Sequence, residues 1–275
     1  MSGTADPVPE VLEAELLDVA RAAARVAATE LLTRYEQTAE GLDTKTTATD
    51  PVSDADRAAE AAIRALLAER RPDDAILGEE GGETAGSTDE SSGVRWVVDP
   101  LDGTVNYLFR YPQWSVSVAA EDADGNALAG VVLDPLRDEE LSATRSGAPL
   151  RDGAPVVPAP RAATLDVALV ATGFGYDAAV RARQAEVLRD VLPRVRDVRR
   201  GGSAALDLAW TALGRCDAYW ERGVKAWDVA AGGLLCARAG LELHELPAAD
   251  GLPSGLLAAP PALAAELLAL VAGRG

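Results

Sequence analysis

The chain of 275 residues carries 44 acidic and 26 basic side chains, which gives a formal net charge of −18. A chain this acidic lacks the basic face that nucleic acids and anionic membranes need, so we expect neither as a partner. Hydrophobic residues make up 48% of the sequence, which is typical of a globular protein with a sizeable core, in one large domain or two closely packed halves.

The first half predicts two helices followed by a largely antiparallel sheet. Apolar residues recur at helical spacing over residues 8–38. A second helix is predicted at 53–72, with Ser53 as its N-cap and Pro72 at its end. A short buried strand at 75–80 leads into a polar loop at 81–93. Further strands are predicted at 94–99, 114–121, 127–133 and 140–145, and "DADGN" between the second and third of these indicates a hairpin.

The second half predicts alternating strands and helices, which is typical of an α/β layer. Strands are expected at 165–172, 196–200, 216–221 and 255–259, and helices at 178–191, 203–213, 226–239 and 261–272. The change of pattern lies near residues 146–153, so we divide the chain into an N-terminal α+β half, 1–149, and a C-terminal α/β half, 150–275. The expected fold class is therefore a layered combination of α+β and α/β structure.

The cysteines and the apolar stretches indicate a cytoplasmic protein. Cys216 and Cys236 are the only two cysteines, and their spacing fits neither a disulfide framework nor a paired metal site. Residues 1–20 lack the basic start and apolar centre of a secretory signal. No apolar run reaches the roughly 18 residues that a membrane helix needs, since the most apolar stretch, 255–271, contains two prolines.

Acidic residues stand at several predicted strand ends and turns. They are Glu79, Glu80, Asp99, Asp102 and Asp228. Any one of them alone is most simply a solvated surface charge. Three of them follow apolar residues that should be buried, however, and clustered carboxylates raise one another's pKa unless a cation neutralises them. Oxygen ligands without cysteine or histidine favour Mg²⁺, so this set predicts a magnesium site.

The sequence "DPLDGT" adds a phosphate site to this prediction. A short helix is expected at 104–109, and the backbone amides of Gly103 and Thr104 would lie at its start, where free N–H groups favour an anion. Carboxylates for a cation would thus stand beside a place for a phosphate. The combination suggests metal-assisted phosphoryl hydrolysis.

Two longer segments, "WVVDPLDGTVNYLFRYPQWSVSVA" and "GVKAWDVAAGGLLCARAG", resemble the two signatures of the inositol monophosphatase family. The segments "TATDPVSDAD", "GEE" and "RRGGSAALDLAWTALGRCDAYWE" occur in the order expected of bacterial members, and the resemblance extends from about residue 10 to 272. It implies an αβαβα sandwich, a homodimer, lithium sensitivity, and two or three Mg²⁺ ions.

The resemblance also implies roles for individual residues. The metal ligands would be the side chains of four acids and one backbone carbonyl: Glu79, Asp99, Asp102, Asp228 and the carbonyl of Leu101. Glu80 would serve a weaker third ion. Asp56 and Thr104 would orient and help to deprotonate the attacking water, with Glu79 as a further catalytic residue. The substrate contacts would come from Lys45, Asp102, Gly103, Thr104, Ala204 and Glu221.

The implied reaction is in-line attack of a metal-activated water on inositol monophosphate. Relatives in the wider superfamily act on histidinol phosphate, fructose-1,6-bisphosphate or 3′(2′),5′-bisphosphate nucleotides, and these substrates stay open as alternatives. Lys225 stands where animal members carry a histidine-type residue, and "GEE" replaces the commoner "SEE". A non-catalytic binding protein is the alternative of a different class, and the intact set of acids argues against it.

Two features have simpler explanations when taken alone. Asp56 stands three residues after Ser53, as in a helix capping box, and only the motif around it favours catalysis. Cys216 and Arg222 have the C-x5-R spacing of cysteine-dependent phosphatases. Acidic and bulky residues fill that segment and glycine is absent, so we do not expect a reactive thiolate there.

Overall fold

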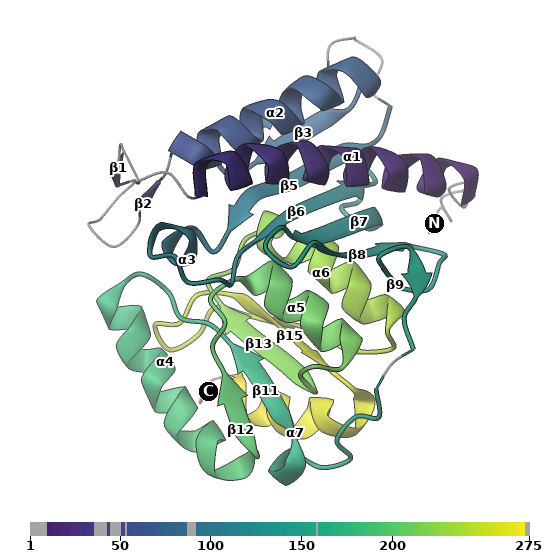
Figure 1. The fold of residues 1–275 in the computed structure, drawn as a ribbon. Helices are drawn as coiled ribbons and strands as arrows, with labels where there is room; N and C mark the ends of the chain where they lie inside the picture. Colours follow the sequence, from purple (N-terminus) through teal and green to yellow (C-terminus); the bar gives the residue numbers. More distant parts are fainter. Residues whose placement is uncertain are drawn as a thin grey trace, which may run out of the picture.

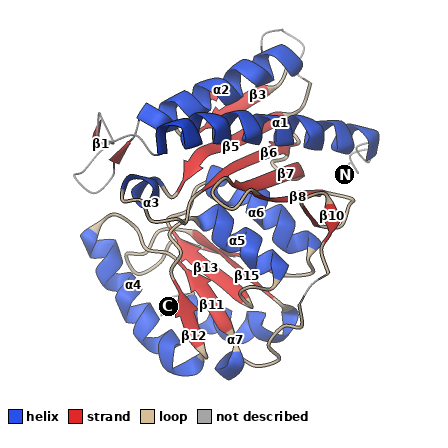
Figure 2. Cartoon of the chain, in the orientation of Figure 1, coloured by secondary structure: helices blue, strands red, loops and turns tan. Residues whose placement is uncertain are grey.

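The computed structural model describes residues 10–35, 43–44, 51–52, 54–86, 92–157 and 159–272. Helices and sheets alternate in five layers, which confirms the predicted layered fold (Figures 1 and 2). Helices α1 (Glu10–Tyr35) and α2 (Asp54–Arg70) cover the first sheet. Helices α5 (Ala204–Leu213) and α6 (Ala226–Arg238) form the middle layer, and α4 (Ala178–Val191) and α7 (Pro261–Val271) cover the second sheet.

The first sheet has eight strands in the order β10-β9-β8-β7-β6-β5-β3-β4, all antiparallel to their neighbours except the parallel pair of β3 and β5. Its strands are β3 (Ala75–Gly78), β4 (Gly82–Thr84), β5 (Arg95–Asp102), β6 (Ser115–Glu121), β7 (Ala127–Asp134), β8 (Glu139–Thr144), β9 (Leu150–Arg151) and β10 (Ala154–Pro155). The predicted division at residues 149 and 150 stays a prediction, while the first sheet itself continues to Pro155.

The second sheet has five strands, ordered β12-β11-β13-β15-β14, with parallel pairing on one side of β13 and antiparallel pairing on the other. They are β11 (Leu169–Thr172), β12 (Asp197–Arg199), β13 (Ala218–Arg222), β14 (Glu242–Leu246) and β15 (Gly255–Ala259). Shorter elements complete the chain: the pair β1 (Asp43–Thr44) and β2 (Pro51–Val52), helix α3 (Thr104–Leu108), and two 3₁₀ turns at Leu165–Val167 and Leu192–Arg194.

Some local predictions were wrong or incomplete. The predicted loop at 81–93 contains β4, because this segment turns back and pairs with β3. The predicted strand at 165–172 starts only at Leu169, since the Asp217 carboxylate accepts the amides of Ala162 and Leu169 and holds the preceding residues in a turn. Strand β14 was missed, because an edge strand with mostly polar residues has no clear apolar period.

The core divides into one apolar cluster on each side of every sheet. Neighbouring residues of a strand enter different clusters: Val131 faces α1 and α2, whereas Val132 faces the middle layer. The third cluster lies between the second sheet and its outer helices α4 and α7. Each fully buried valine or leucine side chain contributes about 1.5–3 kcal/mol through removal from water. The middle layer is thus buried from both sides, and it carries functional residues into the interior.

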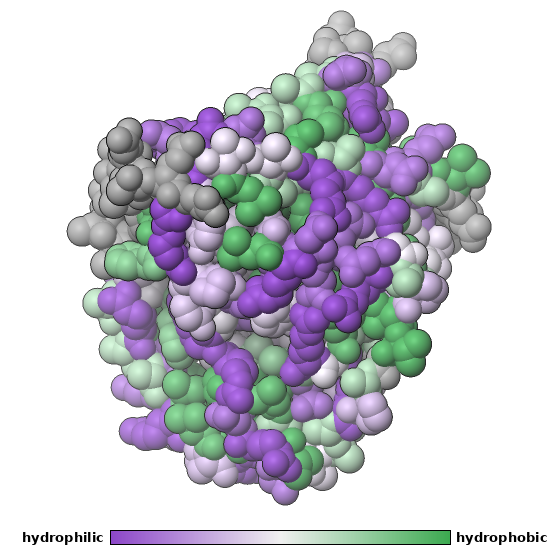
Figure 3. Space-filling view, in the orientation of Figure 1, coloured by the Kyte–Doolittle hydropathy of each residue, from purple (hydrophilic) through white to green (hydrophobic). Residues whose placement is uncertain are grey.

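The outer surface is mixed in character. Figure 3 shows hydrophilic residues in a broad band across the middle of one face, with hydrophobic residues in small groups around it. Over the described parts of the chain, no helix has the length and apolar character needed to span a membrane.

Candidate active site

An irregularity in β5 brings Asp99 and Asp102 to the same face of the first sheet. Asp99 pairs with Ser117 of β6 and Asp102 pairs with Ser115, so three steps along β5 match two steps along β6. In a regular strand, residues three apart point to opposite faces. The extra residue of this β-bulge shifts the alternation of side chains by one position. Both aspartates therefore point toward the middle layer, to the same side as Ser115 and Ser117.

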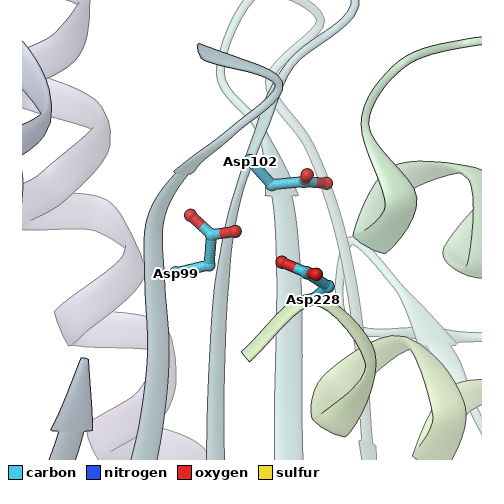
Figure 4. Close-up of side chains that lie close together, drawn as sticks. All are labelled: Asp99, Asp102 and Asp228. Atoms are coloured by element: carbon cyan, nitrogen blue, oxygen red, sulfur yellow. The ribbon is translucent and has the colours of Figure 1, made fainter. Parts of the chain in front are cut away.

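Asp228 completes the cluster from the start of α6. One oxygen of each of Asp99, Asp102 and Asp228 lies within 4.8 Å of the others. Figure 4 shows the three side chains pointing toward one another, two from β5 and one from α6. The backbone amide of Lys225 donates to Asp228 Oδ2 at 2.6 Å, which fixes this carboxylate at the helix terminus.

Asp102 is held in place by the start of α5. Its Oδ2 accepts hydrogen bonds from Ser203 Oγ at 2.5 Å and from the Ala205 amide at 2.8 Å. Ser203 Oγ lies 3.0 Å from Ser115 Oγ, so a chain of hydroxyls joins β6 to this carboxylate. Ser203 was predicted only as the first residue of a helix and not as a site residue, although serine at a helix start is a recognisable N-cap signal.

Thr104 and Asp56, two of the predicted site residues, lie next to each other. Thr104 Oγ1 lies 3.3 Å from Asp56 Oδ2 and 3.1 Å from the carbonyl oxygen of Leu101. Asp56 is fully buried on α2, and Leu101, directly before Asp102, is fully buried as well. The hydroxyl of Thr104 therefore connects the bulge of β5 to the buried acid of α2.

Glu79 lies at the same cleft, on the turn that follows β3. Glu80 is the next residue of this turn, and it is half-buried outside the group of side chains that line the cleft. Both amides that follow Glu79, those of Glu80 and Gly81, donate to the buried carboxylate of Glu60. Glu60 was missed because an acid inside an amphipathic helix is ordinarily a surface residue.

The cleft has a volume of about 300 Å³, and Asp99, Asp102 and Asp228 are among the residues that line it. Gly103 lies on it with φ of 93°, a left-handed conformation that favours glycine. Ala204 and Glu221 also line the cleft, together with Arg200 and Lys225. Tyr219 donates its hydroxyl to Glu221 at 3.1 Å. Lys45 lies outside the described residues.

The negative charges of the three aspartates are not neutralised by a basic side chain of the described residues. Burial is the main cause that raises the pKa of Asp99 and Asp228 well above the ordinary value, and mutual repulsion among the carboxylates adds to it. Burial raises the pKa of Asp102 to about 6, although the bonds from Ser203 and Ala205 act in the opposite direction. None of the three forms an ion pair with an arginine or lysine of the described chain. Buried, converging carboxylate oxygens without a basic partner fit a divalent cation such as Mg²⁺.

Glu221, which also lines the cleft, is a further carboxyl group with a raised pKa. Burial, with repulsion from Asp207 as the next cause, raises the pKa of Glu221 to about 8. Burial also raises the pKa of the Cys216 thiol to about 12, so the thiol stays protonated at neutral pH. This agrees with the expectation that the C-x5-R spacing of Cys216 and Arg222 has no catalytic meaning.

These shifts predict how the stability of the metal-free protein depends on pH. A carboxyl group with a raised pKa holds its proton more tightly in the folded state than in the unfolded chain, whose aspartates titrate near about 4. Stability is therefore lost as the pH rises from about 4 through about 6 and above. In chelator, we expect the Tm to be at least about 5 °C lower at pH 8 than at pH 5, with Mg²⁺ removing most of the difference. A calorimetric Tm in EDTA that is as high at pH 8 as at pH 5 would contradict this.

Comparison with known proteins identifies close similarity over nearly the whole chain. The sequence model of the inositol monophosphatase family matches residues 12–273. The "Inositol-1-monophosphatase SuhB" of Mycobacterium tuberculosis is 47% identical over 230 residues, which cover 82% of this chain and 79% of that protein. The "Nus factor SuhB" of Pseudomonas aeruginosa is 42% identical over 200 residues, covering 70% of this chain and 71% of that protein.

A solved structure supports the same grouping. The extragenic suppressor protein suhB from Bartonella henselae superposes with a TM-score of 0.84 at 33% sequence identity. The match covers 94% of this chain and the whole of that one. The five-layer arrangement is therefore shared with a protein of clearly related sequence.

Proposed function

This chain belongs to the inositol monophosphatase family, and on that premise we propose that it is a Mg²⁺-dependent phosphomonoesterase that hydrolyses inositol monophosphate to inositol and phosphate. The observation that carries the proposal is the convergence of Asp99, Asp102 and Asp228 in a cleft beside the Thr104–Asp56 hydrogen bond. Such a cluster, without a basic partner of its own, suits cations that in turn attract an anionic substrate.

We assign the metal to the residues at the acidic side of the cleft. Glu79, Asp99, Asp102, Asp228 and the Leu101 carbonyl would hold two ions, and Glu80 would serve a weaker third. Bound there, Mg²⁺ would lower the pKa of a water molecule and neutralise charge on the phosphate and the leaving oxygen.

Groups around the metal ligands would transfer the proton and bind the phosphate and the alcohol. Thr104 Oγ1 would orient the attacking water and accept its proton, and would pass its own proton to Asp56 Oδ2, 3.3 Å away. The amides of Gly103 and Thr104 would bind phosphate oxygens. Asp102, Glu221 and the Ala204 backbone would contact the hydroxyls of the alcohol.

Release of inorganic phosphate from inositol 1-phosphate tests the proposal directly. We expect turnover with Mg²⁺, a loss to background in excess EDTA, and recovery when Mg²⁺ is restored. Millimolar Li⁺ should inhibit the Mg²⁺-supported activity. A protein that releases no phosphate from any phosphomonoester with Mg²⁺ would overturn the assignment as an enzyme.

A bisphosphate is the second candidate substrate, and one observation favours it. Arg200 and Lys225 both line the cleft that contains the metal ligands, so two cations of this chain lie within reach of a bound substrate. A second phosphate on the substrate would find charge partners there. Comparing kcat/KM for inositol 1-phosphate, histidinol phosphate, fructose-1,6-bisphosphate and adenosine 3′,5′-bisphosphate separates the candidates, since a bisphosphate enzyme should prefer one of the last two.

The remaining expectations belong to the same proposal. We propose a cytoplasmic homodimer that works without nucleic acid or membrane as a partner. The name "Nus factor SuhB" of the Pseudomonas relative raises a non-catalytic role as the alternative. Phosphate release separates the two roles, because a binding protein without catalytic function would not turn over substrate.

A further inference from the structure

Glu60, a buried glutamate outside the family motifs, lies directly behind the turn that carries Glu79 and Glu80. This residue of α2 is only 2% exposed. Its Oε2 accepts the amide of Glu80 at 2.7 Å, and its Oε1 accepts the amide of Gly81 at 2.8 Å. Both oxygens of one carboxylate therefore bind consecutive amides of the turn.

Arg64, one helical turn further along α2, balances the charge of Glu60. Its Nε donates to Glu60 Oε1 at 2.7 Å. The same guanidinium donates to the carbonyl of Gly82 at 2.7 Å and to Thr84 Oγ1 at 3.0 Å. Together the two side chains bind the backbone from Glu80 to Gly82 and the side chain of Thr84, and so attach the turn and the start of β4 to α2.

The fit between Glu60 and the turn is close enough to require glycine on both sides. A Cβ atom at Gly78 would lie 2.7 Å from the carboxyl carbon of Glu60, and one at Gly81 would lie 2.6 Å from Oε1. Any side chain at these positions would push the carboxylate away from the amides. The glycine in "GEE" thus has a physical reason in this chain, because it admits Glu60.

Helix α2 also carries Asp56, one turn before Glu60, so a single rigid element reaches both Thr104 and the turn of Glu79. Side chains behind metal ligands set the orientation of those ligands, and their loss weakens metal binding although they do not touch the metal. We propose that Glu60, supported by Arg64, is a positioning residue that fixes Glu79 beside the three aspartates. This inference rests on the proposed metal-dependent function.

The substitution Glu60→Gln tests the inference, because it keeps the size of the side chain but places an amide N–H against one of the two backbone N–H groups. Titration calorimetry with Mn²⁺ alone measures metal affinity without substrate. We expect affinity to fall by about 10–100-fold. The kcat at saturating Mg²⁺ should stay within about threefold of wild type, with the Mg²⁺ requirement shifted upward by the same factor as the affinity.

Glu69→Gln is the matched control, because Glu69 is an exposed residue of the same helix. It should leave Mn²⁺ affinity unchanged. Arg64→Gln keeps Glu60 but releases its charge partner, so we expect a smaller loss of affinity in the same direction. This variant decides the matter if Glu60→Gln does not fold.

The outcomes separate the inference from the proposed function. Wild-type Mn²⁺ affinity in Glu60→Gln, or in Arg64→Gln if only that variant folds, would overturn the positioning role and leave the phosphatase proposal intact. A lower Tm without any change in metal affinity would mark Glu60 as purely structural and would also overturn it. If the wild-type protein neither binds Mn²⁺ nor releases phosphate, the proposed function fails together with the inference.

Discussion

Asp102→Asn is expected to abolish turnover, with a fall in kcat/KM of at least about a thousandfold, or about 4 kcal/mol of transition-state stabilisation. The substitution removes one negative charge from the proposed metal site while keeping the shape of the side chain. A neutral amide is a poorer ligand for Mg²⁺, which prefers carboxylates. Phosphate release under saturating Mg²⁺ measures the effect.

The same variant should fold as well as the wild type. The amide oxygen can still accept from Ser203 and Ala205, which now bind Asp102 Oδ2. Removing a charge from a repelling cluster should keep the Tm of the metal-free protein at pH 8 equal to or above that of the wild type. Asp124→Asn, at an exposed hairpin turn, is the matched control. Asp102→Asn protein with near-normal turnover would refute the metal role of Asp102.

Thr104→Val is expected to lower kcat by about 10²–10³, the usual range for loss of a group that handles a proton in the transition state. Valine keeps the branched shape but has no hydroxyl to bridge Asp56 and the Leu101 carbonyl. Because the metal-ligand carboxylates are untouched, Mn²⁺ affinity should stay within about twofold of wild type. Steady-state kinetics measures the fall in kcat, and calorimetry measures the unchanged Mn²⁺ affinity.

Thr33→Val serves as the comparison, since Thr33 is exposed and its hydroxyl donates to a carbonyl of its own helix, that of Thr29 at 2.7 Å. It should leave kcat unchanged. If Thr104→Val retains kcat within a few-fold of wild type, the hydroxyl takes no part in proton transfer, and Asp56 must reach the attacking water by another route.

The acids of the cluster could be predicted because carboxylates, the residue type that binds Mg²⁺, stand at the ends of predicted apolar elements. Asp99 and Asp102 end an apolar strand, and Asp228 begins a helix, so each had to lie at an element's end near the core. The five-layer order came from the resemblance and not from periodicity. Alternating apolar residues predict strands, but they do not indicate which helix packs on which sheet.

The supporting residues could not be predicted in the same way. Glu60 is one of several acids on α2, and its burial depends on a turn about twenty residues further along the chain. Ser203 acts on a carboxylate 101 residues away in sequence. The bulge of β5 is visible only from its pairing with β6, since a register shift leaves no mark in a single strand. Tertiary contacts, and not local propensity, decide all three.

The bulge also makes the difference in length between the facing segments from Asp99 to Asp102 and from Ser115 to Ser117 more critical than the identity of the residues between the two aspartates. Other residues can stand at positions 100 and 101 if they fit the core and leave the carbonyl in place. Gain of one residue between Ser115 and Ser117 would give three steps against three, a regular register in which one of the two carboxylates points toward the outer helices α1 and α2. In the evolution of this strand pair, substitution at positions 100 and 101 is therefore tolerable where an insertion in the facing segment of β6 is not.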